Sequence, residues 1–198
     1  NKGITEQFPL DGVRSLYGTT KLAAELMIQE YRATYGVRSI INRCGVLAGP
    51  WQMGKVDQGF VALWVASHYY GKSLGYHGFG GLGLQVRDIL HPTDLYELLK
   101  IQLGDINKFS GKAYNVGGGR ELSISLLELT AICRDITGKE IEIGAVPETR
   151  EADIAYYVTD ATEIKNESGW LPQISAHEIV KDVYRWIKKN DLALRSIF

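Results

Sequence analysis

The sequence has little of what marks several large classes of protein. It holds only two cysteines, Cys44 and Cys133, which are too few for a disulfide framework and fit a reducing, cytoplasmic location. Its longest apolar run, residues 60–66, is far too short to cross a membrane. The 22 basic and 23 acidic residues give a net charge of -1. The sequence contains no cluster of lysine and arginine residues, so nothing in it indicates a nucleic-acid partner.

Signs of a metal centre are also missing. The two cysteines lie far apart in the sequence, and the histidines show no spacing typical of metal ligands. The four histidines are His68, His77, His91 and His177. We therefore expect no metal site, and nothing in the sequence points to a cysteine nucleophile.

Helical and strand-like segments alternate along the chain, as in α/β proteins. Apolar residues at a helical spacing predict a helix over residues 16–35, which Gly36 ends. The mostly apolar residues 37–44 predict a buried strand directly after it. Further helices are expected over residues 57–70, 94–103, 125–137, 161–168 and 175–190, and further strands over 86–90, 113–116 and 139–145. A helix followed by glycine and a buried strand is typical of a parallel α/β sheet.

One glycine-rich segment matches a cofactor-binding signature by its letters. Gly78, Gly80 and Gly83 spell G-x-G-x-x-G, which in dinucleotide-binding proteins joins a strand to a helix whose N-terminus holds the pyrophosphate. Here residues 84–88 have the pattern of a strand. The sequence therefore favours a flexible loop on the substrate side over a dinucleotide site.

The chain contains a repeated pair of residue types that can carry proton transfer. In a Tyr-x-x-x-Lys pair, the phenol and the ammonium lie on one helix face, and the ammonium favours the phenolate needed for a general base. The three pairs are Tyr17/Lys21, Tyr96/Lys100 and Tyr184/Lys188. Only the first stands at the start of a helix among small residues, where a cofactor or sugar could approach. The pair Tyr96/Lys100 lies on a helix whose leucines are expected to make core contacts. The pair Tyr184/Lys188 lies on an amphipathic helix, where it is expected on the solvated face.

Two arginines with acidic neighbours are candidates for holding a phosphate group. Arg87 precedes Asp88, and Arg150 is followed by Glu151 and Asp153. A guanidinium group suits bidentate recognition of phosphate. An ordinary surface ion pair fits the same pattern.

Taken together, these segments resemble the extended short-chain dehydrogenase/reductase family, the NAD-dependent nucleotide-sugar epimerases and dehydratases. Residues 17–21, Tyr-Gly-Thr-Thr-Lys, look like the family's catalytic Tyr-Gly-x-Ser/Thr-Lys helix. Residues 80–91 look like its Gly-x-Gly-x-Gln-x-Arg-Asp segment. The remaining landmarks follow the same order, at residues 43–50, 114–118, 150–153 and 169–172.

The resemblance implies an α/β fold that is the C-terminal portion of a Rossmann-type parallel sheet, interleaved with a smaller α/β substrate domain. The N-terminal cofactor-binding half is expected to be missing, since the chain opens without Met in what reads as a loop already in progress. The implied division has residues 1–50 as the remainder of the cofactor domain and 51–86 as an insertion of the substrate domain. Residues 87–118 then return to the Rossmann sheet, and 119–198 form the C-terminal substrate-binding domain.

The resemblance also implies roles for single residues. Tyr17 would be the general base and acid at the sugar hydroxyl, and Lys21 would hold the ribose of NAD and favour the Tyr17 phenolate. Both would therefore contact the cofactor. Arg87 and Arg150 would hold the nucleotide diphosphate.

Other substrate-side roles are less sharply implied. Gln52 and Gln58 would line the pocket for the sugar or the base. Asn115 and Asp153 fit a binding role and ordinary hydrogen bonding at a strand end or helix cap equally well. Val46 stands where many members carry a substrate-binding Asn, so the sugar contacts are expected to differ.

The activity that the resemblance implies is an epimerisation with NAD as cofactor. Residues 56–60 and 85–91 are most similar to epimerases that act at C2 of a CDP-linked sugar, by oxidation to a keto sugar and reduction on the other face. A nucleotide-sugar 4-epimerase, a 4,6-dehydratase and a non-catalytic sugar-nucleotide-binding module are the alternatives. The expected partners are a nucleotide-diphosphate sugar and a second copy of the protein, as a homodimer, with no nucleic acid and no membrane.

The expected lack of a dinucleotide loop leads to a direct prediction. The 198-residue chain by itself should not bind NAD, because the letter match at Gly78 to Gly83 cannot cradle a pyrophosphate. Titration calorimetry of the chain with NAD tests this. Binding in the micromolar range would contradict the prediction.

Overall fold

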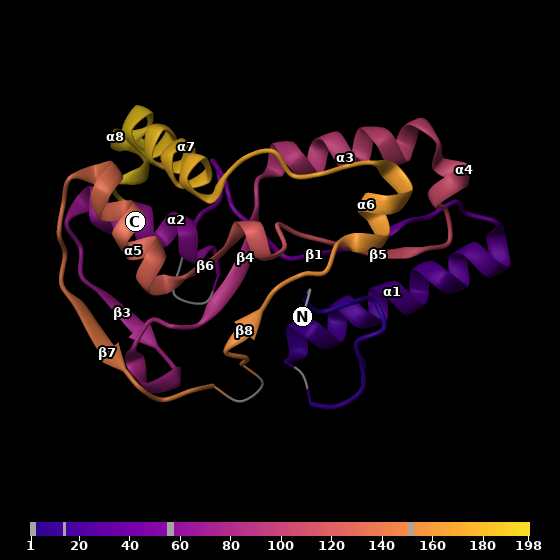
Figure 1. The fold of residues 1–198 in the computed structure, drawn as a ribbon, viewed down its shortest axis with the longest axis horizontal. Coiled ribbons are helices and arrows are strands. Elements are labelled where there is room, and N and C mark those ends of the chain that lie inside the picture. Colours follow the sequence, from indigo (N-terminus) through magenta and orange to yellow (C-terminus); the bar gives the residue numbers. More distant parts are fainter. Residues whose placement is uncertain (1–2, 14, 55–57, 151–152) are drawn as a thin grey trace.

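The computed structural model describes residues 3–13, 15–54, 58–150 and 153–198. Its elements fall into two halves, with short strands between them (Figure 1). One half contains α1 (Leu16–Tyr35), β1 (Ile41–Cys44), α3 (Pro92–Gly104), α4 (Ile106–Phe109), β5 (Ala113–Val116) and α6 (Thr162–Ser168). The other contains α2 (Phe60–Tyr70), β3 (Leu74–His77), α5 (Leu126–Thr137), β7 (Ile143–Val146), α7 (Ala176–Lys189) and α8 (Asp191–Leu194). The strands between them are β2 (Val46–Leu47), β4 (Val86–Leu90), β6 (Ser123–Ser125) and β8 (Tyr156–Tyr157).

One strand path joins the two halves. β1 pairs in parallel with β5, with Ile41 opposite Ala113. The N–H of Gly45 still donates to the carbonyl of Val116 at 2.8 Å. The chain then continues as β2, which pairs in parallel with β4. β4 also pairs antiparallel with β6 and parallel with β8, whereas β3 and β7 form a separate parallel pair.

Side-chain caps explain where three helices begin. Ser15 Oγ accepts the N–H of Gly18 at 3.1 Å at the start of α1. Ser125 and Glu128 form a reciprocal capping box at the start of α5. The imidazole of His91 caps α3, so the helix begins at Pro92, two residues before the predicted residue 94. Each cap satisfies N–H groups that the first helical turn leaves without a partner.

Buried side chains form two hydrophobic clusters. The larger lies where α2, α5 and α7 pack together, and its members include Trp64, Val65, Leu129, Ile179 and Val183. The smaller joins β5 to α3, α4 and α6 and comprises Leu90, Leu98, Phe109, Tyr114, Val116, Ile164 and Trp170. The two clusters give each half of the molecule its own core.

The helix α1 is placed differently from the other long helices. It lies on one side of the β1–β5 pair, with α3 and α6 on the other side (Figure 1). The structure describes α1 over its whole length, and none of its residues is buried. Its exposed apolar side chains include Leu16, Leu26, Met27, Tyr31 and Tyr35. No helix within the described ranges has the length and apolar character needed to cross a membrane.

The predicted strand over residues 37–44 is too long, because β1 begins only at Ile41. Just before it, the N–H of Ser39 donates to the hydroxyl of Ser110 at 3.2 Å, and its carbonyl accepts the N–H of Gly111 at 2.8 Å. The Ser110 hydroxyl thus replaces a backbone acceptor for the N–H of Ser39, and regular pairing of β1 with β5 begins two residues later, at Ile41.

Other predicted bounds shift in the same way. The strand expected over residues 139–145 occupies 143–146. The helix expected over 57–70 begins at Phe60, and residue 57 lies outside the described residues. The prediction missed β2, β6, β8, α4 and α8, which have two to four residues each. Elements this short cannot show a period of 2.0 or 3.6 residues in their sequence.

The buried carboxylate of Asp94 ties the C-terminal segment to α3. Its two oxygens accept the N–H groups of Gln173 and Ile174, each at 3.1 Å. Its backbone carbonyl accepts the indole N–H of Trp170 at 2.9 Å. One residue in the first turn of α3 thus fixes the chain between α6 and α7.

Replacing Asp94 with Ala should lower the free energy of unfolding by about 3 kcal/mol, because two backbone N–H groups would lose a charged acceptor. Urea denaturation followed by circular dichroism measures this. Asp135→Ala is the matched control, since the Asp135 side chain is 79% exposed. A loss below about 1 kcal/mol for Asp94→Ala would show that the carboxylate does not hold this segment.

Candidate functional site

The start of α1 presents a phenol and an ammonium group on one exposed face. The Lys21 Nζ lies 5.3 Å from the centroid of the Tyr17 ring, and Tyr17 is 63% exposed. The hydroxyls of Thr19 and Thr20 donate to helix carbonyls, at 3.1 and 2.8 Å. Those threonines are thereby occupied within the helix, and the phenol and ammonium are left facing outward.

The ring geometry of the three Tyr-x-x-x-Lys pairs does not distinguish them. The distances from ammonium to ring centroid are 5.3, 5.5 and 6.0 Å for the pairs at 17/21, 96/100 and 184/188. Their surroundings do differ. Lys100 forms an ion pair with Glu97 at 2.8 Å, and Tyr184 packs edge-on against Tyr69. Among the residues that the structure describes, Lys21 forms no ion pair.

An arginine fork attaches the same helix face to the sheet. Arg43 of β1 donates from Nε and Nη2 to both carboxylate oxygens of Glu25, at 2.7 to 3.1 Å. Its Nη1 donates to the carbonyl of Glu6 at 3.3 Å. The hydrogen bond with Glu25 raises the pKa of Arg43, so the guanidinium stays charged. The sequence prediction did not include Arg43 or Glu25 as site residues. The available signals were that Arg43 begins the landmark at residues 43–50 and that Glu25 follows Tyr17 by eight residues.

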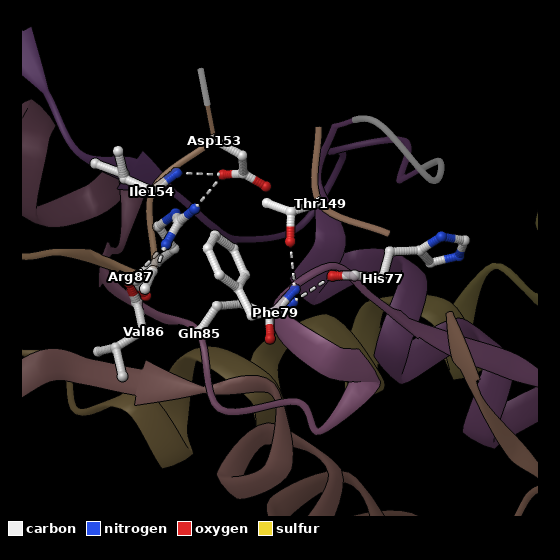
Figure 2. Close-up of polar contacts among 9 residues, drawn as sticks. His77, Phe79, Gln85, Val86, Arg87, Thr149, Asp153 and Ile154 are labelled. Atoms are coloured by element: carbon white, nitrogen blue, oxygen red, sulfur yellow. Dashed lines mark hydrogen bonds and ion pairs between the residues drawn. The ribbon is translucent and has the colours of Figure 1, made fainter. Parts of the chain in front are cut away.

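Arg87 is held by an acidic residue far away in the sequence, as Figure 2 shows. Its Nη2 donates to Asp153 Oδ1 at 2.8 Å. Its Nη1 donates to the carbonyls of Val86 and Ala155, at 2.8 and 3.4 Å. The guanidinium is therefore fixed in direction, and its ionic partner is Asp153, not the adjacent acidic residue.

Asp88, next to Arg87 on β4, is fully buried. Its Oδ2 accepts the N–H of Gly119 at 3.1 Å. Burial raises the pKa of Asp88, against the effect of its hydrogen bonds. A side chain at Gly45 would come within 3.1 Å of the carboxylate, and one at Gly117 would overlap it.

The glycine-rich segment lies between two strands. β3 precedes it and β4 follows it, and the segment itself contains only a single 3-10 turn, Phe79–Gly81. It therefore lacks the strand-to-α-helix geometry of a dinucleotide loop. Figure 2 shows how it is tied: the N–H of Phe79 donates to Thr149 Oγ1, and the Gln85 amide donates to the carbonyl of His77, each at 2.8 Å. The loop is thus more fixed than predicted. Residues 71–75 also spell G-x-S-x-G, but they join α2 to β3, and a nucleophile elbow joins a strand to a helix.

The remaining predicted site residues are spread over three places. The carbonyl of Arg150 accepts the N–H of Asp153 at 3.2 Å, which brings Arg150 close to the partner of Arg87. The amide of Gln52 donates to the carbonyl of Leu47 at 2.9 Å. Gln58 is exposed.

Asn115 has a local structural role. Its buried side chain donates to the carbonyl of Ile4 at 2.9 Å, and its N–H donates to Glu6 Oε1 at 2.8 Å. In the described ranges no three His, Cys, Asp or Glu side chains lie close enough to hold a metal ion. Burial raises the pKa of the Cys133 thiol, which is the opposite of the shift that activates a cysteine.

Comparisons with known proteins agree with this geometry. Residues 1–117 match the NAD dependent epimerase/dehydratase family, and the chain belongs to this family. A CDP-paratose 2-epimerase of Salmonella typhi is 32% identical over 187 residues, which cover 93% of this chain and 54% of that protein. The chain thus spans about half the length of the curated relatives it matches.

Solved structures show the same fold. A dTDP-glucose 4,6-dehydratase of Bacillus anthracis, in complex with NAD, is 27% identical with a TM-score of 0.81, over 100% of this chain and 59% of that one. A UDP-glucose 4-epimerase of Thermotoga maritima, with UDP-glucose, is 25% identical with a TM-score of 0.77, over 90% of this chain and 55% of that one. The mixed α/β fold with parallel strands and the resemblance to this family are therefore confirmed.

The described residues fit one part of NAD. The exposed ammonium of Lys21 and phenol of Tyr17 can hold ribose hydroxyls and the reacting centre beside them. In the ranges that the structure describes, the glycine turn 117–119 after β5 leads only into a single 3-10 turn, Arg120–Leu122, and then into β6, so it forms no pyrophosphate cradle at the start of an α-helix. The fit is therefore to the ribose and nicotinamide side of the cofactor.

The raised pKa of Asp88 gives a pH-dependent prediction. An unfolded Asp loses its proton near pH 3.9, whereas folded Asp88 keeps its proton to higher pH. Folding is therefore penalised increasingly as the pH rises from the unfolded value through the folded one. Asn cannot ionise, so the unfolding free energy of Asp88→Asn minus that of the parent should increase over this range and then level off.

Urea denaturation from pH 3 to pH 7 measures that difference. Asp135→Asn, at a largely exposed carboxylate, is the control for the substitution itself. A flat difference for Asp88→Asn would show that Asp88 ionises as easily in the folded protein as in the unfolded chain.

Proposed function

We propose that the protein carrying this chain is an NAD-dependent epimerase of nucleotide-diphosphate sugars that acts at C2 of a CDP-linked sugar, as in the interconversion of CDP-paratose and CDP-tyvelose. The observation that carries the proposal is the exposed Tyr17–Lys21 pair at the start of α1, in a chain of the epimerase/dehydratase family. The 32% identity to a CDP-paratose 2-epimerase supports the choice of sugar and carbon.

In this proposal Tyr17 carries the proton transfer. When bound, NAD supplies a hydride acceptor and later a hydride donor. The Tyr17 phenolate takes the proton of the hydroxyl at the carbon being oxidised, and gives it back when the keto sugar has turned its other face. The Lys21 ammonium, 5.3 Å from the ring, stabilises the phenolate and holds ribose hydroxyls.

Arg87 and Arg150 are proposed to hold the diphosphate. Asp153 already directs the Arg87 guanidinium through an ion pair at 2.8 Å, and a guanidinium held in this way loses little freedom when a phosphate binds. The backbone bond between Arg150 and Asp153 keeps the two arginines in one region. Gln52 and Gln58 are proposed to line the pocket for the sugar or the base.

We also propose the domain division implied by the sequence, with residues 1–50 and 87–118 in a Rossmann-type cofactor domain and 51–86 and 119–198 in a substrate domain. The two separate hydrophobic clusters support it. The exceptions are Ile164 of α6 and Trp170, which pack in the smaller cluster, and Ala48 and Ile89, which pack in the larger one. A homodimer formed through the exposed apolar side chains of α1, and a cytoplasmic location, complete the proposal.

Two other activities share the same support from the family. The structural neighbours include a UDP-glucose 4-epimerase and a dTDP-glucose 4,6-dehydratase, and a non-catalytic sugar-nucleotide-binding module is a third reading. Product analysis separates them. A dehydratase releases water, a 4-epimerase inverts a different carbon, and a binding module returns its ligand unchanged.

Tyr17→Phe in the full-length protein should lower kcat at least ~100-fold, the usual contribution of a general acid and base, while the circular dichroism spectrum stays unchanged. The measurement is turnover of CDP-paratose or CDP-tyvelose followed by NMR. Tyr96→Phe is the matched control, because its pair with Lys100 has nearly the same ring geometry. Turnover by Tyr17→Phe at the parental rate would falsify the catalytic assignment.

A further inference from the structure

Three residues of α1 follow one another along a single helix face. Tyr17, Lys21 and Glu25 are spaced by four residues, and such a spacing turns a side chain by only about 40° about the helix axis. The first two are the proposed catalytic pair. Glu25 lies one turn beyond Lys21, and a carboxylate at this spacing is within reach of the ammonium group.

In the structure Glu25 is occupied by Arg43 instead. Both of its oxygens accept hydrogen bonds from the Arg43 fork at 2.7 to 3.1 Å. The two side chains are only 21% and 18% exposed. Bidentate arginine–carboxylate pairs are among the strongest and most directional ion pairs in proteins. Glu25 is thus held at a defined place and direction.

This ion pair matters because little else holds α1. The structure describes the whole helix, and none of its residues is buried. A second attachment lies nearer the C-terminal end, where the Arg32 guanidinium packs against the backbone of Gly111 so closely that a side chain at position 111 would overlap it. The end that carries Tyr17 and Lys21 depends on the Glu25–Arg43 pair.

Arg43 is itself well fixed. It extends from β1, which pairs in parallel with β5, and its third donor reaches the carbonyl of Glu6. The carboxylate of Glu6 in turn accepts the N–H of Asn115 on β5 at 2.8 Å. The guanidinium group of β1 therefore holds both the helix and the segment before it, and that segment is in turn bound to β5.

We propose that Arg43 is a positioning residue for the catalytic pair, and that it acts in two ways. It fixes the rotation of α1, so that the Tyr17–Lys21 face is directed toward the site. It also keeps the Glu25 carboxylate from pairing with Lys21, which leaves the ammonium for Tyr17 and the ribose. This inference rests on the proposed catalytic role of Tyr17 and Lys21.

The two effects can be separated with variants of the full-length protein. Arg43→Met loses the anchor and releases Glu25 toward Lys21. Glu25→Gln loses the charged anchor and leaves Lys21 free. The double variant combines the loss of the anchor with a free Lys21. The proposal therefore ranks Arg43→Met as the slowest, with the double variant faster than Arg43→Met.

The expected size follows from the sensitivity of catalysis to small displacements, since about 1 Å can cost about 100-fold. Arg43→Met should lower kcat at least about tenfold, with KM for the nucleotide sugar within about twofold of the parent. Adding Glu25→Gln should recover about twofold of the loss in kcat, as expected if an i,i+4 ion pair is removed. Lys100→Met, which removes the exposed pair with Glu97 on α3, is the matched control and should change neither constant.

Hydrogen exchange provides a readout that does not depend on turnover. Amides in the first half of α1 should exchange faster in Arg43→Met than in the parent, while the amides of β5 keep their protection. A double variant no faster in turnover than Arg43→Met would overturn the sequestering of Glu25, and unchanged exchange in α1 would overturn the anchor. If the parent itself does not turn over the nucleotide sugar but α1 exchange responds as expected, the proposed function fails while the anchor stands.

Discussion

The two halves of the molecule depend on one crowded junction around the buried carboxylate of Asp88. At Gly45 the strand path leaves β5 and passes to β4, and a side chain there would crowd that carboxylate, whereas one at Gly117 would overlap it. The N–H of Gly119, beyond the end of β5, binds the same carboxylate from the other side. Asp88 therefore determines how the end of β5, in one half of the molecule, lies against β4, which leads into the other half. Since side chains alternate along a strand, Arg87 on the same strand is directed away from this junction and reaches Asp153.

The groups proposed to do chemistry are placed outside the two hydrophobic clusters. Tyr17 and Lys21 are exposed on a helix without a buried residue, and Arg87 lies in a network of polar contacts with residues 153–155. Neither set is held by apolar packing. Both are held by a guanidinium–carboxylate pair, Arg43 with Glu25 and Arg87 with Asp153. Such pairs fix direction as well as position, which is what a proton-transfer group and a phosphate ligand require.

The longer elements could be predicted because they repeat a pattern. The helices over 16–35 and 175–190 show it clearly, and the observed bounds differ by no more than a residue at either end. The strand β5 was predicted at its observed bounds, 113–116. The strands of two or three residues, β2, β6 and β8, could not be predicted, because their formation is decided by partners far away in the chain. The same holds for the site. Tyr17 and Lys21 carry a local motif, whereas the ion pairs of Arg43 and Arg87 join residues that are 18 and 66 positions apart.

Local geometry alone does not make a Tyr-x-x-x-Lys pair a catalytic pair. All three pairs of this chain bring the ammonium to within 5.3 to 6.0 Å of the ring centroid, because any helix does so at this spacing. The nearest carboxylate separates two of the pairs. Glu97 pairs with Lys100 and uses its charge, whereas Glu25 is turned to Arg43. In the proposed function, Lys21 is available to Tyr17 because its helical neighbour Glu25 has another partner, and that partner comes from a strand of the sheet.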